Sequence, residues 1–249
     1  MYSIVTSYKF VKINNLGEIR DKLKYLCEKH KIKGTILVAK EGINFTLSGA
    51  LEDLEQLLIE IKEISYFSDL KYNNYTSASF IPFKKMKVRL KNEIVALKDT
   101  NLIDLDMSQN PPGKHLDADE WNKLISEEGV IVVDTRNSYE VAYGTFKNAI
   151  NPDTQSFAEI TDWLKSHIEI NNKDQKIAMF CTGGIRCEKS TAYVRSLGFE
   201  NVYHLNGGVL KYFQDTSGKD NLWEGNLFIF DDRIALDKNL ESINQNEGR

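Results

Sequence analysis

One short stretch carries the residue types that covalent sulfur chemistry needs. It runs from Phe180 to Glu188 and reads FCTGGIRCE, so a cysteine, two glycines and an arginine follow in order. An apolar run typical of a buried strand ends just before Cys181, and a helical pattern begins after the glycines. The backbone N–H groups of such a turn can converge on one atom and stabilise negative charge there. We therefore expect Cys181 to be an accessible thiolate near neutral pH and to act as a nucleophile.

The neighbours of Cys181 support this assignment. Gly183 and Gly184 allow a tight turn without a Cβ penalty, and Arg186 supplies a fixed positive charge. The predicted active-site loop comprises Thr182, Gly183, Gly184, Ile185, Arg186 and Cys187. Cys187 has two interpretations: it resolves a persulfide or disulfide on Cys181, or it packs at the helix start. For Cys181 the plain alternative is a buried structural cysteine, and the ordered set of neighbours argues against it.

Composition narrows the class of protein. The chain has 249 residues, enough for one large or two ordinary domains, and its 41% hydrophobic content suffices for real cores. We find no apolar run long enough for a bilayer and no signal peptide, so we expect a cytoplasmic protein without membrane contact. Three cysteines do not suit a disulfide framework, and the histidines are scattered. We therefore predict no metal site and no cofactor, since no flavin, haem or iron fingerprint is visible.

Charge divides the chain into two parts. Residues 1–95 carry 16 Lys/Arg and 11 Asp/Glu, a net charge of +5, whereas residues 96–249 carry 16 and 25, a net charge of −9. Such asymmetry indicates two units with different partners, and the basic unit is suited to a polyanion.

The first unit, residues 1–97, has the pattern of a ferredoxin-like fold. Aromatic and β-branched runs predict strands, and apolar residues at helical spacing predict two helices between them. The resulting order is β-α-β-β-α-β. The predicted segments are strands at 3–11, 33–39, 43–48 and about 70–75, and helices that begin near 16 and 51.

A basic strand follows within the same unit. Basic residues alternate with apolar ones, so a strand would place the cations on one face and the apolar side chains on the other. The alternating basic residues are Lys85, Lys87, Arg89 and Lys91, and a further lysine, Lys84, directly precedes them. An ordinary solvated edge strand is the alternative. Because no acidic residue interrupts the series, we favour a phosphate-contacting surface, with residues 93–97 as its hairpin partner.

The rest of the chain divides into a linker, an α/β domain and an extension. Residues 98–116 are rich in Asn, Asp, Pro and Gly and predict a linker. Residues 117–225 alternate short apolar strands with helices, which predicts a parallel sheet with its site at the strands' carboxyl ends. In this domain we expect Asp134 and Arg136 to pair and brace the cysteine loop. Residues 226–249 form a C-terminal extension whose polar last dozen residues predict a disordered end.

These segments resemble a known family. The 117–225 region resembles a rhodanese domain in its Asp-Thr-Arg segment at 134–136, its cysteine loop and its Gly-Gly pair at 207–208. The whole chain from about 5 to 235 is similar to the rhodanese-containing tRNA uridine(34) hydroxylases. That likeness also includes Lys33–Leu37, Glu41–Asn44, Met86–Lys91 and Trp223–Gly225.

The resemblance implies an oxidoreductase that forms 5-hydroxyuridine at the wobble position of tRNA with molecular oxygen as co-substrate. It also implies that Cys181 forms a persulfide and that the anticodon loop of tRNA is the partner. The electron or sulfur donor is unknown. Many members carry a longer tail with further cysteines, whereas this sequence has none after Cys187.

Three other functions fit parts of the pattern. A sulfurtransferase would move sulfane sulfur from a Cys181 persulfide to a protein or RNA acceptor. A cysteine phosphatase would commonly space its cysteine and arginine by five residues, whereas here Arg186 follows Cys181 after only four. That shorter loop suits sulfur better than phosphate. A non-enzymatic RNA-binding module would not need the complete cysteine loop.

Overall fold

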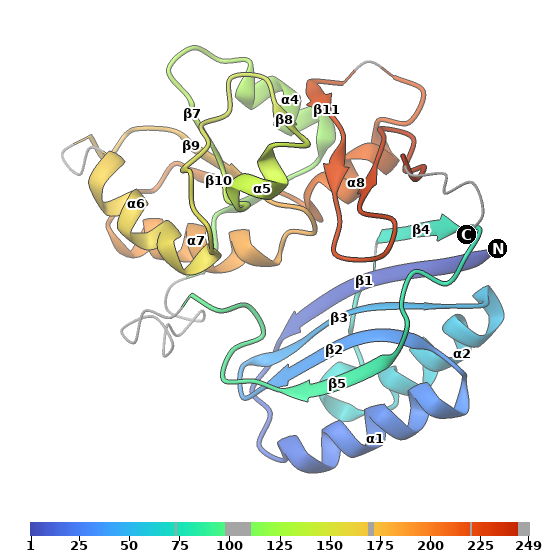
Figure 1. Ribbon diagram of the computed structural model, residues 1–249. Coiled ribbons are helices and arrows are strands. Elements are labelled where there is room, and N and C mark those ends of the chain that lie inside the picture. The colour runs from blue at the N-terminus through green and yellow to red at the C-terminus, as the bar shows by residue number, and fades with distance from the viewer. Residues whose placement is uncertain (73, 98–110, 169–171, 220, 244–249) are drawn as a thin grey trace. The chain divides into compact units, whose positions relative to one another are not determined.

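The computed structural model describes residues 1–72, 74–97, 111–168, 172–219 and 221–243. Within them the chain forms two compact units (Figure 1). The first comprises Met1–Val95 and Phe230–Ile234, and the second comprises Ala96–Ile229 and Ala235–Ile243. None of the described helices has the length and apolar content needed to cross a bilayer.

The first unit is a ferredoxin-like domain, as predicted. Its elements are β1 (Tyr2–Phe10), α1 (Leu16–Lys29), β2 (Lys33–Ala39), β3 (Gly42–Gly49), α2 (Leu51–Lys62), a 3-10 turn (Ser65–Phe67) and β4 (Asn74–Ala78). The strand order β4-β1-β3-β2 is antiparallel throughout. Both helices lie on one face of the sheet (Figure 1), where Leu23 and Leu58 share a core with Ile36 and Phe45.

The basic segment forms the edge strand β5 (Met86–Leu90) of this sheet. Met86 and Val88 pack against the core, whereas the side chains of Lys84, Lys85, Lys87, Arg89 and Lys91 are exposed. The predicted hairpin with residues 93–97 is wrong, because β5 pairs in parallel with β2 instead.

Side chains take the place of strand pairing in the segment after β5. The Ile94 N–H donates to Oε1 of Glu41 at 2.6 Å, and Nδ2 of Asn44 donates to the Ile94 carbonyl at 3.1 Å. These contacts satisfy the backbone N–H and carbonyl of Ile94, which a hairpin would have paired with β5.

The second unit is an α/β domain with a parallel sheet in the order β6-β10-β9-β7. Its elements are β6 (Lys114–Leu116), α4 (Ala118–Ile125), β7 (Ile131–Asp134), α5 (Ser138–Val141), β8 (Gly144–Phe146), a 3-10 turn (Phe157–Glu159), α6 (Ile160–His167), β9 (Ile177–Phe180), α7 (Ile185–Ser196), β10 (Val202–Leu205), α8 (Gly208–Asp215) and β11 (Trp223–Gly225). β11 pairs antiparallel with β8. β6 begins within the stretch that the sequence assigned to the linker, and residues 98–110 of that linker lie outside the described residues.

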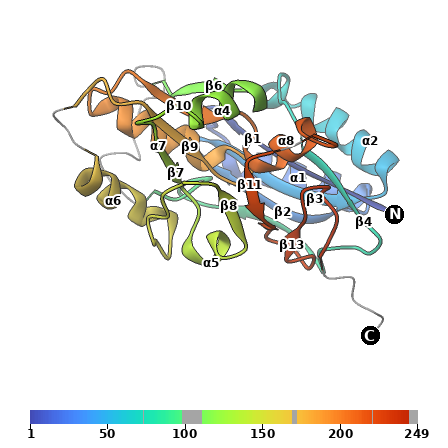
Figure 2. The same cartoon turned by 90° about the horizontal axis from the view of Figure 1, so that it is seen from above.

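Helices cover both faces of this sheet, and strand alternation sorts the side chains between them. Ala178 and Phe180 belong to a core that includes Trp121 of α4 and Val209 of α8. Met179 points to the other face, where its sulfur accepts a hydrogen bond from the Ser190 hydroxyl of α7 at 3.5 Å. α6 packs beside α7 (Figures 1 and 2). A parallel sheet covered in this way explains why the central strand β9 is apolar and buried along its whole length.

The segment after β11 contributes residues to both units. β12 (Leu227–Phe228) pairs antiparallel with β13 (Ala235–Leu236), whereas Phe230–Ile234 between them belongs to the first unit. There the buried Arg233 pairs with Asp231 and donates to the Thr76 hydroxyl at 2.8 Å. The end of the chain was predicted to be disordered from residue 237, and this is wrong for residues 237–243: the Asp237 N–H donates to the Glu241 carbonyl at 2.9 Å, and the Ile243 N–H donates to the Ala235 carbonyl at 3.2 Å. Residues 244–249 of the predicted disordered end lie outside the described residues.

Candidate active site

Cys181 lies in the turn between β9 and α7, at the carboxyl end of a central strand of the parallel sheet. Gly184 is the N-cap of α7 and has a φ of 95°, a left-handed conformation that side chains disfavour. Ile185 then begins the helix. The sequence therefore placed the loop correctly between its strand and its helix.

The start of α8 holds this loop from a second element. The N–H groups of Val209 and Leu210 donate to the carbonyls of Cys181 and Thr182 at 3.0 and 3.1 Å. Gly208 permits the contact, since a Cβ at that position would lie 2.5 Å from the Cys181 carbonyl oxygen. Gly208 thus allows the start of α8 to hold the cysteine loop in place.

The loop makes Cys181 the thiolate of the site. The Gly184 N–H donates to the Cys181 sulfur at 3.1 Å. Burial raises the pKa of Cys181, but the Cys187 thiol, the Arg186 charge and the backbone N–H groups of Arg186 and Cys187 together lower it to about 6. Cys181 is therefore mostly ionised at pH 7, as the loop pattern predicted.

Cys187 is the proton-bearing partner of this thiolate. Burial and the neighbouring Cys181 raise the pKa of Cys187 well above its ordinary value. It is fully buried, and its sulfur lies 3.7 Å from the Thr135 hydroxyl. As a thiol, Cys187 can donate a hydrogen bond to the Cys181 sulfur, so it contributes to the charge stabilisation of the site.

Cys181 is less accessible than the sequence predicted. Only 1% of the residue is exposed. The reason is that the loop which supplies the N–H donors also surrounds the sulfur. A substrate atom must therefore either enter the loop to contact the Cys181 sulfur, or react with a further atom that is bonded to this sulfur.

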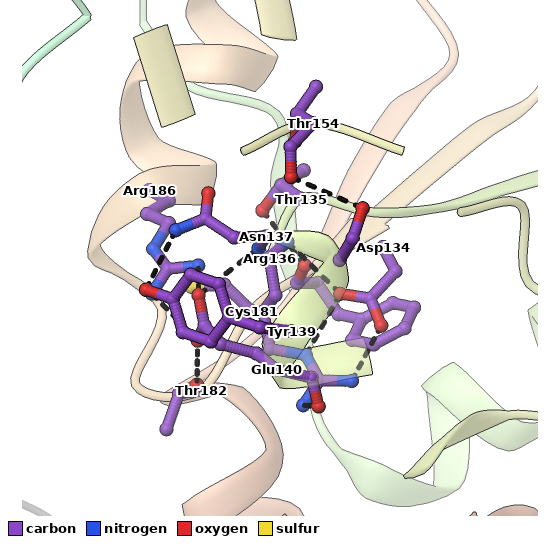
Figure 3. Close-up of polar contacts among 12 residues, drawn as sticks. Asp134, Thr135, Arg136, Asn137, Tyr139, Glu140, Thr154, Cys181, Thr182 and Arg186 are labelled. Atoms are coloured by element: carbon purple, nitrogen blue, oxygen red, sulfur yellow. Dashed lines mark hydrogen bonds and ion pairs between the residues drawn. The ribbon is translucent and has the colours of Figure 1, made fainter. Parts of the chain in front are cut away.

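Arg186 is held beside the loop by a carboxylate from α5 (Figure 3). Its two terminal nitrogens donate to the two oxygens of Glu140 at 2.8 and 2.9 Å. Glu140 is fully buried, and its Oε2 also accepts the Asn137 N–H at 3.1 Å. The bidentate pair fixes the guanidinium near Cys181 and raises the pKa of Arg186 despite burial.

Asp134 and Arg136 pair as the sequence predicted. Nε and Nη2 of Arg136 donate to the two Asp134 oxygens at 2.9 and 2.6 Å, and both residues are fully buried (Figure 3). Nη2 also donates to the Gly144 carbonyl at 2.6 Å. The guanidinium lies 4.9 Å from the Trp223 ring centroid. This pair therefore ties the end of β7 to β8 and to the aromatic core next to the loop.

Sequence reasoning missed Glu140 as part of the site. No spacing rule connects Glu140 with Arg186, which lies forty-six residues further along the chain. The predicted RNA-contacting residues on β5 belong to the first unit, whereas the cysteine loop belongs to the second.

Comparison with known proteins agrees with both domains. Residues 2–94 match the UPF0176 acylphosphatase like domain, and residues 117–215 match the rhodanese-like domain. Acylphosphatase-like domains have the ferredoxin-like strand order seen in the first unit.

Curated relatives cover nearly the whole chain. A protein of Anaplasma phagocytophilum is 46% identical over 96% of this chain and 84% of its own length. One from the Wolbachia of Culex pipiens is 48% identical over 96% and 82%, and one from Rickettsia bellii is 45% identical over 96% and 94%. All three bear the name tRNA uridine(34) hydroxylase. With identity at this level over both domains, the chain belongs to the tRNA uridine(34) hydroxylase family.

Proposed function

We propose that this protein hydroxylates uridine 34 of tRNA, forming 5-hydroxyuridine with molecular oxygen as co-substrate. The observation that carries the proposal is the preorganised thiolate of Cys181 in a chain whose relatives share the hydroxylase name over both domains. A tRNA substrate also implies that the enzyme works in the cytoplasm.

The proposed reaction replaces a C–H bond of the uracil ring with a C–OH bond. One atom of O₂ enters the product, and a two-electron donor together with two protons reduces the other atom to water. We assign Cys181 the role of the reactive group, either as the thiolate or as a persulfide. A persulfide would place its outer sulfur about 2 Å beyond the buried Cys181 sulfur, which suits a site whose cysteine is 1% exposed.

The remaining loop residues would then stabilise negative charge. Gly184 already donates its N–H to the Cys181 sulfur, and the N–H groups of Arg186 and Cys187 act on the same atom. Such fixed donors in a buried loop stabilise a developing anion without reorganisation. Arg186 adds a charge that Glu140 holds in place.

We assign tRNA contact to the exposed cations of β5. Side chains on one face of a strand follow each other at about 7 Å, so the alternating cations of β5 form a row of positive charge suited to a phosphate backbone. RNA-modifying enzymes read unstacked bases in loops. Phosphate contacts on β5 would therefore hold the anticodon arm while base 34 leaves its stack.

Neutralising the β5 cations should weaken tRNA binding. We expect Lys85, Lys87 and Arg89 changed together to Ala to lower affinity at low salt by at least tenfold. The slope of log affinity against log salt should fall by about 0.7–0.9 for each phosphate that the variant no longer neutralises. The matched control is the same change at Lys22, Lys24 and Lys29, exposed cations of α1 in the same unit. Equally weak binding by both variants would show a general charge effect and remove β5 as the contact surface.

Nucleoside mass spectrometry tests the function directly. A bacterial strain without its own 5-hydroxyuridine pathway is given this gene, and its tRNA is digested and measured. We expect 5-hydroxyuridine to appear, and growth under ¹⁸O₂ should label its new oxygen. Absence of the nucleoside while the protein is present and folded would overturn the proposal.

Sulfur transfer is the second candidate, because the rhodanese match and the ionised Cys181 both suit a persulfide. In that case the same tRNA digest would lack 5-hydroxyuridine. The purified protein would instead pass labelled sulfur from thiosulfate to a thiol acceptor.

A further inference from the structure

Two histidines and a glutamate from three elements of the second unit meet beside the parallel sheet. His115 of β6 and His204 of β10 are register partners on neighbouring parallel strands, so their side chains point to the same face. Helix α7 packs on β10 and contributes Glu188. One ligand atom from each of the three residues lies within 4.8 Å of the others.

The contacts within this cluster leave ring nitrogens for a ligand. Nε2 of His115 lies 3.0 Å from Oε1 of Glu188, and the two imidazole centroids are 4.0 Å apart. His204 is fully buried, and neither of its nitrogens makes a hydrogen bond with any residue that the structure describes. The Gly113 backbone lies nearby, but without the geometry of a hydrogen bond to either ring nitrogen. A buried polar group in this state is costly unless something else binds it.

We propose that His115, His204 and Glu188 bind one divalent transition-metal ion. Imidazole nitrogens and a carboxylate oxygen are the donors that Zn²⁺ and Fe²⁺ accept, and three protein ligands leave positions open for water or another small ligand. Neighbouring ligands of such an ion lie about 3 Å apart, given bonds of about 2.1 Å. The His115–Glu188 distance already has this value, and the ligand atom of His204 lies within 4.8 Å of the other two.

The surroundings give the ion a route in and hold the ligands in place. The His115 side chain is 43% exposed, whereas that of Glu188 is 10% exposed, so the ion enters from the β6 side. The Gly113 N–H donates to the Thr191 hydroxyl at 2.9 Å, which attaches the start of β6 to α7 next to the cluster. This contact keeps His115 and Glu188 facing each other, as supporting contacts do in metal sites.

The proposed metal site uses neither Cys181 nor Cys187 as a ligand. Cys187 precedes Glu188 in the chain, but its sulfur faces Cys181 and Thr135. Metal bound by the cysteines and metal bound by the cluster can therefore be separated by substitution.

Calorimetry on the full-length protein without an affinity tag tests the site. Chelator-treated protein is titrated with Zn²⁺, and with Fe²⁺ in the absence of oxygen. We expect one ion per chain and a higher melting temperature for the loaded protein. His115→Ala and Glu188→Gln should each weaken binding by at least about 100-fold. His115→Ala is the main test variant, because the His115 side chain is partly exposed and its removal should not disturb the core.

Two controls assign the ligands. His167→Ala removes an exposed histidine of α6 outside the cluster and should leave binding unchanged. Cys181→Ser should also leave it unchanged, and the Co²⁺-loaded protein should show no thiolate-to-metal absorption. The proposal fails if neither ion binds, if His115→Ala binds as the parent does, or if the cysteine variant is the one that loses the ion.

Discussion

Replacing the thiolate should abolish the modification. In cells that depend on this protein, Cys181→Ser is expected to lower 5-hydroxyuridine in tRNA at least about 1,000-fold, to background. A serine hydroxyl stays protonated near neutral pH and cannot form a persulfide, although it fits the same space. The measurement is nucleoside mass spectrometry of tRNA, with protein levels matched between strains.

The other two cysteines provide the control for this result. Burial raises the pKa of Cys27 to about 12, and Cys187 is held protonated, so one thiol alone should ionise near neutral pH. Ultraviolet absorbance of the parent protein should show thiolate appearing as pH rises through about 6, and Cys181→Ser should lose that step. Cys27→Ala should keep both the step and the modification. Full modification by the Cys181→Ser variant would remove this residue from the mechanism.

The fold was predictable because the helices and strands of each unit have a clear local pattern of apolar residues. In the first unit, apolar residues at helical spacing such as Leu23 and Leu58 indicated two helices, and both pack on one sheet face. In the second, continuous apolar runs such as 177–180 indicated strands buried on both faces. These signals lie within a few residues of one another, so a sequence displays them directly.

The errors and omissions concern partners that are distant in the chain. The basic strand was recognised by its alternation, but alternation does not identify its neighbour, and β5 paired with β2. Glu140 and Arg186 come from different helices, and His115, Glu188 and His204 come from three elements. Only the fold brings such groups together, because each is an ordinary polar residue in its own segment.

The burial of Cys181 could not be predicted from the sequence, for a physical reason. The loop residues predicted donors aimed at Cys181, and the structure provides them. N–H donors can converge on one sulfur only if the backbone of the loop wraps closely around it. Helix α8 also packs against this backbone at Gly208. The arrangement that ionises the sulfur therefore also encloses it, which favours chemistry at an atom attached to Cys181.

The largest effect on stability is expected at the carboxylate that holds Arg186. Glu140→Gln keeps the side-chain shape but removes the charge opposite a guanidinium whose side chain is 12% exposed. Breaking a buried ion pair on one side costs roughly 3–5 kcal/mol, because the remaining charge stays desolvated. We expect the variant's free energy of unfolding to fall by about 3 kcal/mol, the lower end of that range, since glutamine can still accept one hydrogen bond. Urea denaturation followed by fluorescence measures this change.

The chain offers a closely matched control in Glu120. Each of the two glutamates accepts a backbone N–H at the start of a short helix, from Asn137 at 3.1 Å for Glu140 and from Asp117 at 3.2 Å for Glu120. The Glu120 side chain is 49% exposed, so Glu120→Gln should change stability by no more than about 0.5 kcal/mol. The difference between the two variants then isolates the Arg186 pair from helix capping. A similar fall in stability for both would mean that the pair adds little, and that Arg186 is positioned beside Cys181 by the loop backbone alone.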